Sequence, residues 1–174
     1  MQREGTLTDE TIFLLEQGLE LIEQLDDDLY SNSLPPFFNY GVGSHFRHVL
    51  DFYNCFLAGL ERGRVDYDTR ERDDLIEKDR LAARARIRTI IDFLLELSAT
   101  EDQKAVLVRM EDATAGIDPC RWSSSSLRRE LQFLLSHTVH HYALIALMLR
   151  LKGFVTPEEF GIAPSTLAHW RREG

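Results

Sequence analysis

The spacing of the apolar residues constrains the fold more than any other feature of this sequence. In four long segments these residues recur every three or four positions, which places them along one face of an α-helix. Each such face must be buried against a neighbouring element. The predicted helices begin at about Thr8 and then cover 44–60, 73–97 and 127–152. Since strand signals are few, the pattern predicts an all-α protein built as a four-helix bundle.

The ends of these helices carry local signals. Thr8 is the expected N-cap of the first helix, with Leu7 as the apolar residue before it. Segment 31–43 holds two prolines and two glycines and predicts a loop. The serines at 123–126 offer N-caps for the last helix, and Gly153 supplies its stop.

The 174 residues fit one domain, 1–174. We expect the bundle to occupy about 8–153 and the tail, 154–174, to form short helices. Between the third and fourth helices the helical pattern weakens. KAVLVRM (104–110) alternates somewhat like a strand, and AGIDPCRW (115–122) is typical of a turn.

Composition narrows the class of protein. With 44% hydrophobic and 28% charged residues the chain is an ordinary globular sequence. Its formal charge of −9 argues against nucleic acid and anionic membranes as partners. No signal-peptide core is visible, and no apolar run reaches the roughly 18 residues of a membrane span. Cys55 and Cys120 form no metal-type cluster, so we expect a cytoplasmic protein, although the sequence leaves open whether they pair.

Five of the six histidines fall in two of the predicted helices. SHFRHVLD (44–51) contains His45 and His48, and LLSHTVHHYALIAL (134–147) contains His137, His140 and His141. His137 and His141 are one helical turn apart, the spacing at which two imidazoles can share a metal ion. His140 points partly away from that pair.

Two interpretations of these histidines stay open from the residues alone. Facing helices of a bundle would bring His48 against His137 and His141, and three neutral imidazoles around a divalent ion leave an open coordination position. That is the catalytic rather than the structural arrangement. Alternatively, the histidines are core residues hydrogen-bonded to backbone or to neighbours.

The two histidine segments carry a family resemblance. With VGSHFRHVLDFY (42–53) and SSSLRRELQFLLSHTVHHYALIALMLR (124–150), the chain resembles the DinB-like superfamily of four-helix-bundle, metal-dependent proteins over most of its length up to about Gly153. In that superfamily one ligand comes from the second helix and two, spaced HxxxH, from the last. The resemblance therefore implies His48, His137 and His141 as metal ligands. His48 is preferred to His45 because it matches the second histidine of the family's HLAH-like stretch.

The resemblance also implies a chemistry. The superfamily includes bacillithiol transferases and mycothiol-dependent maleylpyruvate isomerases. We therefore expect a divalent metal (zinc, nickel or iron) that activates water or a low-molecular-weight thiol co-substrate toward a small-molecule substrate, in a hydrolase or a thiol S-transferase. A homodimer is also expected. The alternative is a protein that binds metal without turnover.

Other polar residues near the histidines have weaker assignments. Asp51 is expected to orient a ligand imidazole, or to be a solvated helix residue. Tyr142 is expected to donate a hydrogen bond to substrate, or to pack in the core. His45 and His140 are expected to support the ligands from the side, or simply to pack.

The tail offers a rival function. GFVTPEEFGIAPSTLAHWRR (153–172) resembles a DNA-binding helix-turn-helix with Gly161 at its turn. Against this, Pro157 interrupts the first helix, and the overall charge is wrong for a DNA footprint. A non-catalytic protein whose tail binds DNA or a partner is therefore the alternative, and a tail helix that docks through Leu167 and Trp170 is the simpler one.

Overall fold

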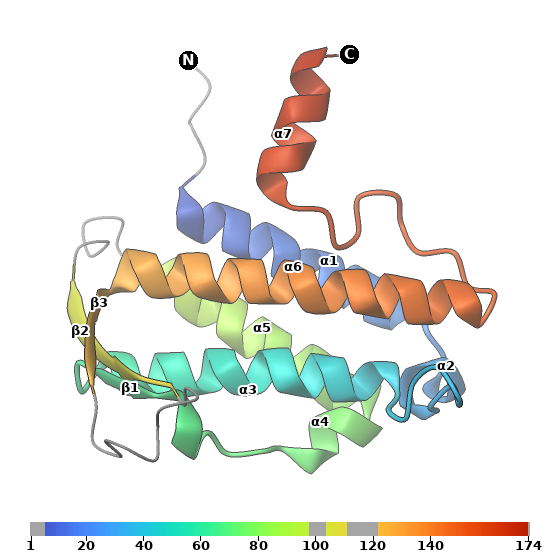
Figure 1. Cartoon of the computed structure of the whole chain (residues 1–174), viewed down its shortest axis with the longest axis horizontal. Coiled ribbons are helices and arrows are strands. Elements are labelled where there is room, and N and C mark those ends of the chain that lie inside the picture. Colours follow the sequence, from blue (N-terminus) through green and yellow to red (C-terminus); the bar gives the residue numbers. More distant parts are fainter. Residues whose placement is uncertain (1–5, 98–103, 111–121, 174) are drawn as a thin grey trace.

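The computed structural model describes residues 6–97, 104–110 and 122–173. Four long helices lie side by side, with α3 and α6 in front of α1 and α5 (Figure 1). Their contacts close a ring, because α3 packs on α5 and α6 and α1 packs on the same two helices. The long helices are α1 (Leu7–Gln24), α3 (Val42–Leu60), α5 (Arg80–Glu96) and α6 (Leu127–Leu151).

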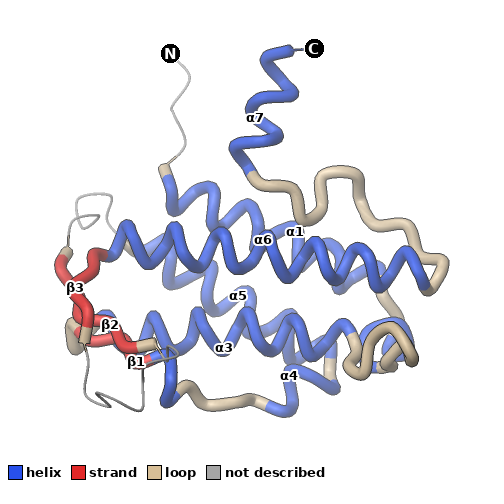
Figure 2. Tube along the Cα trace, in the orientation of Figure 1, coloured by secondary structure: helices blue, strands red, loops and turns tan. Residues whose placement is uncertain are grey.

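Shorter elements join the long helices. Figure 2 shows the described part of the chain as mostly helical, with the strands at one end of the long helices. The short helices are α2 (Asp27–Ser31), the 3-10 turn η1 (Tyr67–Thr69), α4 (Asp74–Lys78) and α7 (Pro164–Glu173). The strands are β1 (Arg64–Asp66), β2 (Ala105–Arg109) and β3 (Ser123–Ser126).

The prediction of an all-α fold is wrong because of this three-stranded sheet. Its order is β1-β2-β3, with β1 parallel to β2 and β2 antiparallel to β3. The strand-like alternation of KAVLVRM is confirmed, since β2 lies within it. The serines of β3 pair with β2 before Ser126 caps α6 by accepting a hydrogen bond from the Arg129 N–H. A three-residue strand and a serine strand are too short or too polar to be found by their pattern.

The predicted helix ends hold to within a few residues, with two instructive corrections. The N-cap of α1 is Thr6, not Thr8, because the Thr6 hydroxyl and the Asp9 carboxylate each accept the other residue's backbone N–H. The predicted helix 73–97 is broken at Asp79, whose backbone is extended (φ −123°, ψ 107°). Its carboxylate caps α5 by accepting from the N–H groups of the first turn, so the chain makes two helices there.

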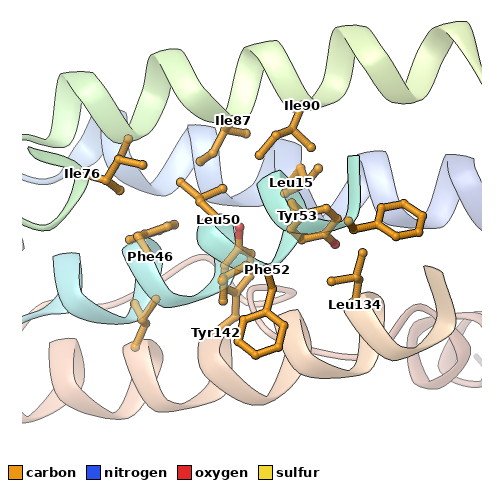
Figure 3. Packing of buried hydrophobic residues seen from close by; sticks show 14 of the residues in the cluster. Leu15, Phe46, Leu50, Phe52, Tyr53, Ile76, Ile87, Ile90, Leu134 and Tyr142 are labelled. Carbon is orange, nitrogen blue, oxygen red and sulfur yellow. The ribbon is translucent and has the colours of Figure 1, made fainter. Parts of the chain in front are cut away.

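The core lies between the four long helices (Figure 3). Tyr53 of α3 and Thr138 of α6 share a buried hydrogen bond of 3.1 Å between their hydroxyls. Phe46 of α3 packs on Tyr142 of α6 with ring centroids 5.7 Å apart. These contacts fix the rotation of α3 and α6 about their axes, and this rotation decides which side chains the two helices present to each other.

The tail packs against α1 and α6 before it leads into α7. Phe160 is buried and stacks on Tyr142 at 4.7 Å, while the Gln17 side chain binds the Glu159 carbonyl and the Gly161 N–H. Gly161 has φ +75°, and a Cβ there would lie 2.9 Å from backbone atoms of α6, so only glycine fits. Residues 158–161 form turns and not a helix, so the first helix of the predicted helix-turn-helix is missing.

Helix α7 projects away from the long helices (Figure 1). Leu167 is buried, but Trp170 is 51% exposed, so the predicted docking through both side chains is wrong for Trp170. The predicted loop of 31–43 is confirmed for 32–41, because Ser31 ends α2 and Val42 begins α3. Most of the predicted turn at 115–122 lies outside the described residues, as does Cys120. No helix in the described ranges is long and apolar enough to cross a membrane.

Candidate metal centre

Three histidines from two helices meet on the α3–α6 interface. His48 comes from α3, and His137 and His141 come from successive turns of α6. Their ring centroids lie 5.0 Å apart for His48 and His137, 4.7 Å for His48 and His141, and 4.5 Å for His137 and His141. One nitrogen of each ring lies within 4.8 Å of the other two. We call these residues the histidine triad.

The surroundings of the triad favour neutral imidazoles. Burial, followed by the charges of Arg70 and Arg47, lowers the pKa of His48 to about 4. Burial and then His48 lower the pKa of His137 to about 4, and burial and then His137 lower that of His141 to about 3. At neutral pH each ring therefore keeps a free lone pair, which is the form that binds a metal.

One nitrogen of the triad, the Nδ1 of His137, is buried without a hydrogen-bond partner among the described residues. A buried polar atom without a partner costs about 1–3 kcal/mol, so such atoms are rare in folded proteins. Imidazole is also a preferred ligand of zinc, nickel, copper and iron. The donor set and the unpartnered nitrogen together fit a bound cation.

His45 lies behind the triad on α3. Its Nδ1 is 2.9 Å from the Nδ1 of His141, so one of the two rings donates a hydrogen bond to the other. The contact engages Nδ1 of His141 and leaves its Nε2 for another partner. His140 is different, since it is exposed and meets His141 edge-on with centroids 5.0 Å apart. Of the two supporting histidines predicted, His45 has the polar contact with a triad member.

Asp51 and Tyr142 are placed away from the triad. The Asp51 carboxylate accepts from the Arg47 side chain and from the Asp73 N–H, both at 3.4 Å. It forms no hydrogen bond with a histidine anywhere in the described ranges, and it ties the segment before α4 to α3. Tyr142 is fully buried, and its hydroxyl points at Gly18 of α1. It therefore packs in the core rather than lining the site.

An aromatic wall that the sequence reasoning missed borders the triad. The Phe52 ring lies 4.5 Å from that of His137 and 5.0 Å from that of His48, and Phe133 stacks on His137 at 5.7 Å. Phe52 follows His48 by one turn and Phe133 precedes His137 by one turn, so helical spacing could have found both. Tyr67 of η1 completes the wall and stacks on Phe52 at 5.2 Å.

A buried carboxylate braces this wall. Glu130 in the first turn of α6 is 6% exposed and accepts hydrogen bonds from the Tyr67 hydroxyl at 2.9 Å and the Ser125 hydroxyl at 2.5 Å. The three side chains join η1, β3 and α6. Because Tyr67 packs on Phe52 and Phe133, the brace fixes the aromatic side of the site.

An open groove of about 720 Å³ runs along α3 next to the site. Its α3 wall starts at Asp51, one turn after His48, and continues through Cys55 toward β1. Burial, then the charge of Asp66, raises the pKa of the Cys55 thiol to about 11, so it stays protonated and unreactive at neutral pH. Beyond α3, the groove is lined by arginines 62, 64, 70, 72 and 86 and by the acids Asp66, Glu71 and Asp73.

Comparison with known proteins places the chain in no family. No protein-family model and no solved structure matches it. It is similar to a protein named FK506-binding protein 5 from Rhizopus delemar, with 37% identity over 111 residues. That match covers 63% of this chain but 28% of the relative, so the chain spans little more than a quarter of the relative's length. The site's function must therefore be argued from its own residues.

Proposed function

We propose that this protein is a metal-dependent enzyme of the DinB-like, four-helix-bundle type, with a divalent ion held by His48, His137 and His141. Its activity would be the activation of water or of a low-molecular-weight thiol, as in a hydrolase or a thiol S-transferase. The observation that supports this most is the convergence of three imidazoles from two helices to within 4.8 Å. The ring of four long helices is consistent with the bundle.

The donor set defines what the ion would contribute. Three neutral imidazoles leave the charge of a divalent ion uncompensated, and such a Lewis acid makes water or a thiol easier to deprotonate. Three protein ligands are also the number typical of catalytic zinc sites. Imidazole does not discriminate strongly among zinc, nickel and iron, so availability decides which is bound.

The protein's own groups prepare the site for this role. His45 holds the ring of His141 through the Nδ1 contact, and such support fixes a ligand's tautomer and orientation. Phe52 and Phe133 cover one side of the triad with apolar surface, which limits the access of water. A drier site strengthens electrostatic interactions within it.

Metal content tests the proposal. Protein prepared without chelators is measured by inductively coupled plasma mass spectrometry, before and after incubation with zinc, nickel or ferrous iron. The parent is expected to hold about one ion per chain, and the His137→Ala/His141→Ala variant only traces. His140→Ala/His169→Ala is the matched control, because it also removes two histidines but leaves the triad intact. Circular dichroism checks that each variant is folded.

Two outcomes would contradict a metal centre: traces of metal in the reconstituted parent, or equal metal in parent and triad variant. If metal binds as expected, activity assays separate the two reaction classes. Hydrolysis of p-nitrophenyl acetate reports on water, and consumption of cysteine with 1-chloro-2,4-dinitrobenzene reports on thiol transfer. Either activity should be lost in the triad variant and kept in the control.

A further inference from the structure

The positive charges beside the triad are unusual in a chain with a formal charge of −9. Arg47, Arg70 and Arg72 all lie close enough to His48 to lower its pKa. Arg47 is already paired, since its Nε lies 2.7 Å from the Glu77 carboxylate. The other two arginines form no ion pair within the part of the chain that the structure describes.

Arg70 stands directly over the aromatic wall. Its Cζ lies 4.7 Å from the Phe52 ring centroid, and that ring touches both His48 and His137. Its Nη1 donates to the Tyr67 carbonyl at 2.8 Å, which is a neutral acceptor, and no carboxylate among the described residues forms a direct ion pair with this guanidinium. Stacking and this hydrogen bond hold the guanidinium in place without neutralising it.

Arg70 and Arg72 also line the groove, whose wall includes Asp51 and the acids Asp66, Glu71 and Asp73. Asp51 is buried, accepts its hydrogen bonds from Arg47 and the Asp73 N–H, and forms no direct ion pair with Arg70 or Arg72. The groove therefore presents two guanidinium groups without a direct ion pair among the described residues, and that of Arg70 stands over the ring that contacts His48.

The electrostatics of this arrangement favour a negative ligand. A divalent ion on the triad would add two positive charges beside two guanidinium groups, and like charges this close repel each other. A bound anion converts the repulsion into attraction on both sides. Guanidinium matches a carboxylate in particular, because its planar N–H groups can donate two parallel hydrogen bonds.

We infer that the substrate of the proposed centre is a small organic carboxylate, whose anionic group is bound by Arg70 and Arg72 on the groove wall, with Arg70 standing over the ring that contacts the triad. This inference rests on the proposed function, since it assigns the substrate class of the same site. The half-buried ring of Phe133, which stacks on His137, offers an apolar contact for the rest of the molecule.

Cobalt substitution makes both parts of the inference measurable. Co(II) is titrated into the apo protein and followed by its visible absorption, which gives the metal affinity. Benzoate is then titrated into the Co(II) protein, and benzamide serves as an uncharged probe of the same shape. The same titrations are made on Arg70→Gln, on Arg72→Gln and on Arg62→Gln. The last variant is the control, because Arg62 lines the groove beyond the end of α3 and is not among the charges that act on His48.

The arginine variants are expected to weaken benzoate binding without weakening Co(II) binding. Loss of one guanidinium should weaken benzoate binding about tenfold or more in Arg70→Gln and in Arg72→Gln, because a charge-assisted hydrogen bond is lost. Co(II) binding should stay equal or become tighter, because a repelling charge is gone. A purely structural role for Arg70 would weaken both. Arg62→Gln should match the parent in both titrations.

Three results would overturn the inference. The first is equal benzoate affinity in the parent, Arg70→Gln and Arg72→Gln, and the second is benzamide binding as tight as benzoate binding. In both cases the metal centre itself would stand. The third is a parent that binds no Co(II), which removes the proposed function and the substrate inference together.

Discussion

Gly18 of α1 is predicted to be intolerant of even one added methyl group. A Cβ at this position would lie 2.1 Å from the Tyr142 hydroxyl oxygen, 3.0 Å from its Cζ and 3.3 Å from Cε1 of Phe46. Tyr142 cannot move away easily, because it is fully buried and has Phe46 and Phe160 against its ring. The Gly18→Ala methyl group must therefore displace the ring or separate α1 from α6.

Two opposing terms set the magnitude for Gly18→Ala. Alanine stabilises the interior of a helix by roughly 1 kcal/mol relative to glycine, while overpacking a core costs about 1–3 kcal/mol. A contact as short as 2.1 Å belongs at the upper end of the overpacking range, so the steric term should win. We expect a net loss of about 1–2 kcal/mol and a Tm lower by roughly 2–8 °C for a chain of this size.

Tyr142→Phe isolates the cause. The Tyr142 hydroxyl has no hydrogen-bond partner among the described residues, so its removal should be neutral or stabilising. It also removes the closest atom to the new methyl group. Urea unfolding of both single variants and the double variant should therefore show a coupling of about 1 kcal/mol that favours the double variant. A stabilised Gly18→Ala protein, or strictly additive effects, would refute the reasoning.

Three further predictions concern the site. His45→Ala should weaken metal binding about 10–100-fold, measured in competition with a chromophoric chelator, because the ring of His141 loses its hydrogen-bonded support. His140→Ala should change the metal affinity little. Equal losses of affinity in the two variants would count against a role for the Nδ1 contact. The apo protein should lose stability in urea titrations as the pH falls from about 6.5 toward 4. The reason is that the triad histidines have pKa values of about 3 and about 4 in the folded protein, below the value in the unfolded chain. In this pH range the unfolded chain therefore binds more protons than the folded protein, which favours unfolding. Between pH 7 and pH 5 the loss of stability should be smaller in a variant with alanine at all three triad positions. An equal dependence of stability on pH in the variant and the parent would contradict this prediction. Glu130→Ala should cost about 1–3 kcal/mol by denaturant unfolding, because the Tyr67 hydroxyl is left buried without its acceptor, and an unchanged midpoint would show that the brace contributes nothing.

The long helices were predictable because their apolar spacing is a local property of the sequence. The spacing of His137 and His141 likewise fixes their common helix face wherever the helix is placed. The contact of His48 with them required only that α3 and α6 pack against each other, as amphipathic helices commonly do. These are the features for which local periodicity carries enough information.

The features that were missed depend on partners distant in the sequence. β1 pairs with β2 across about forty residues, and a three-residue strand has no periodicity to detect. Asp79 belongs to a run of charged residues that reads as a solvated helix face, but its carboxylate caps α5. Asp51 binds the Asp73 N–H, a contact that only the folded path of 61–73 creates. Tyr142 is adjacent to His141, and neighbours on a helix face different directions.

The path of the tail decides how this protein can be shortened. A cut after Gly153 would remove Phe160 from the face of Tyr142 and leave the Gln17 side chain without its two backbone partners. Such a deletion would uncover the α1–α6 interface, so any function lost with it would not be evidence for a role of α7. A stop codon placed after Ile162 would leave these contacts in place. The contribution of α7 to stability and function could then be measured by itself.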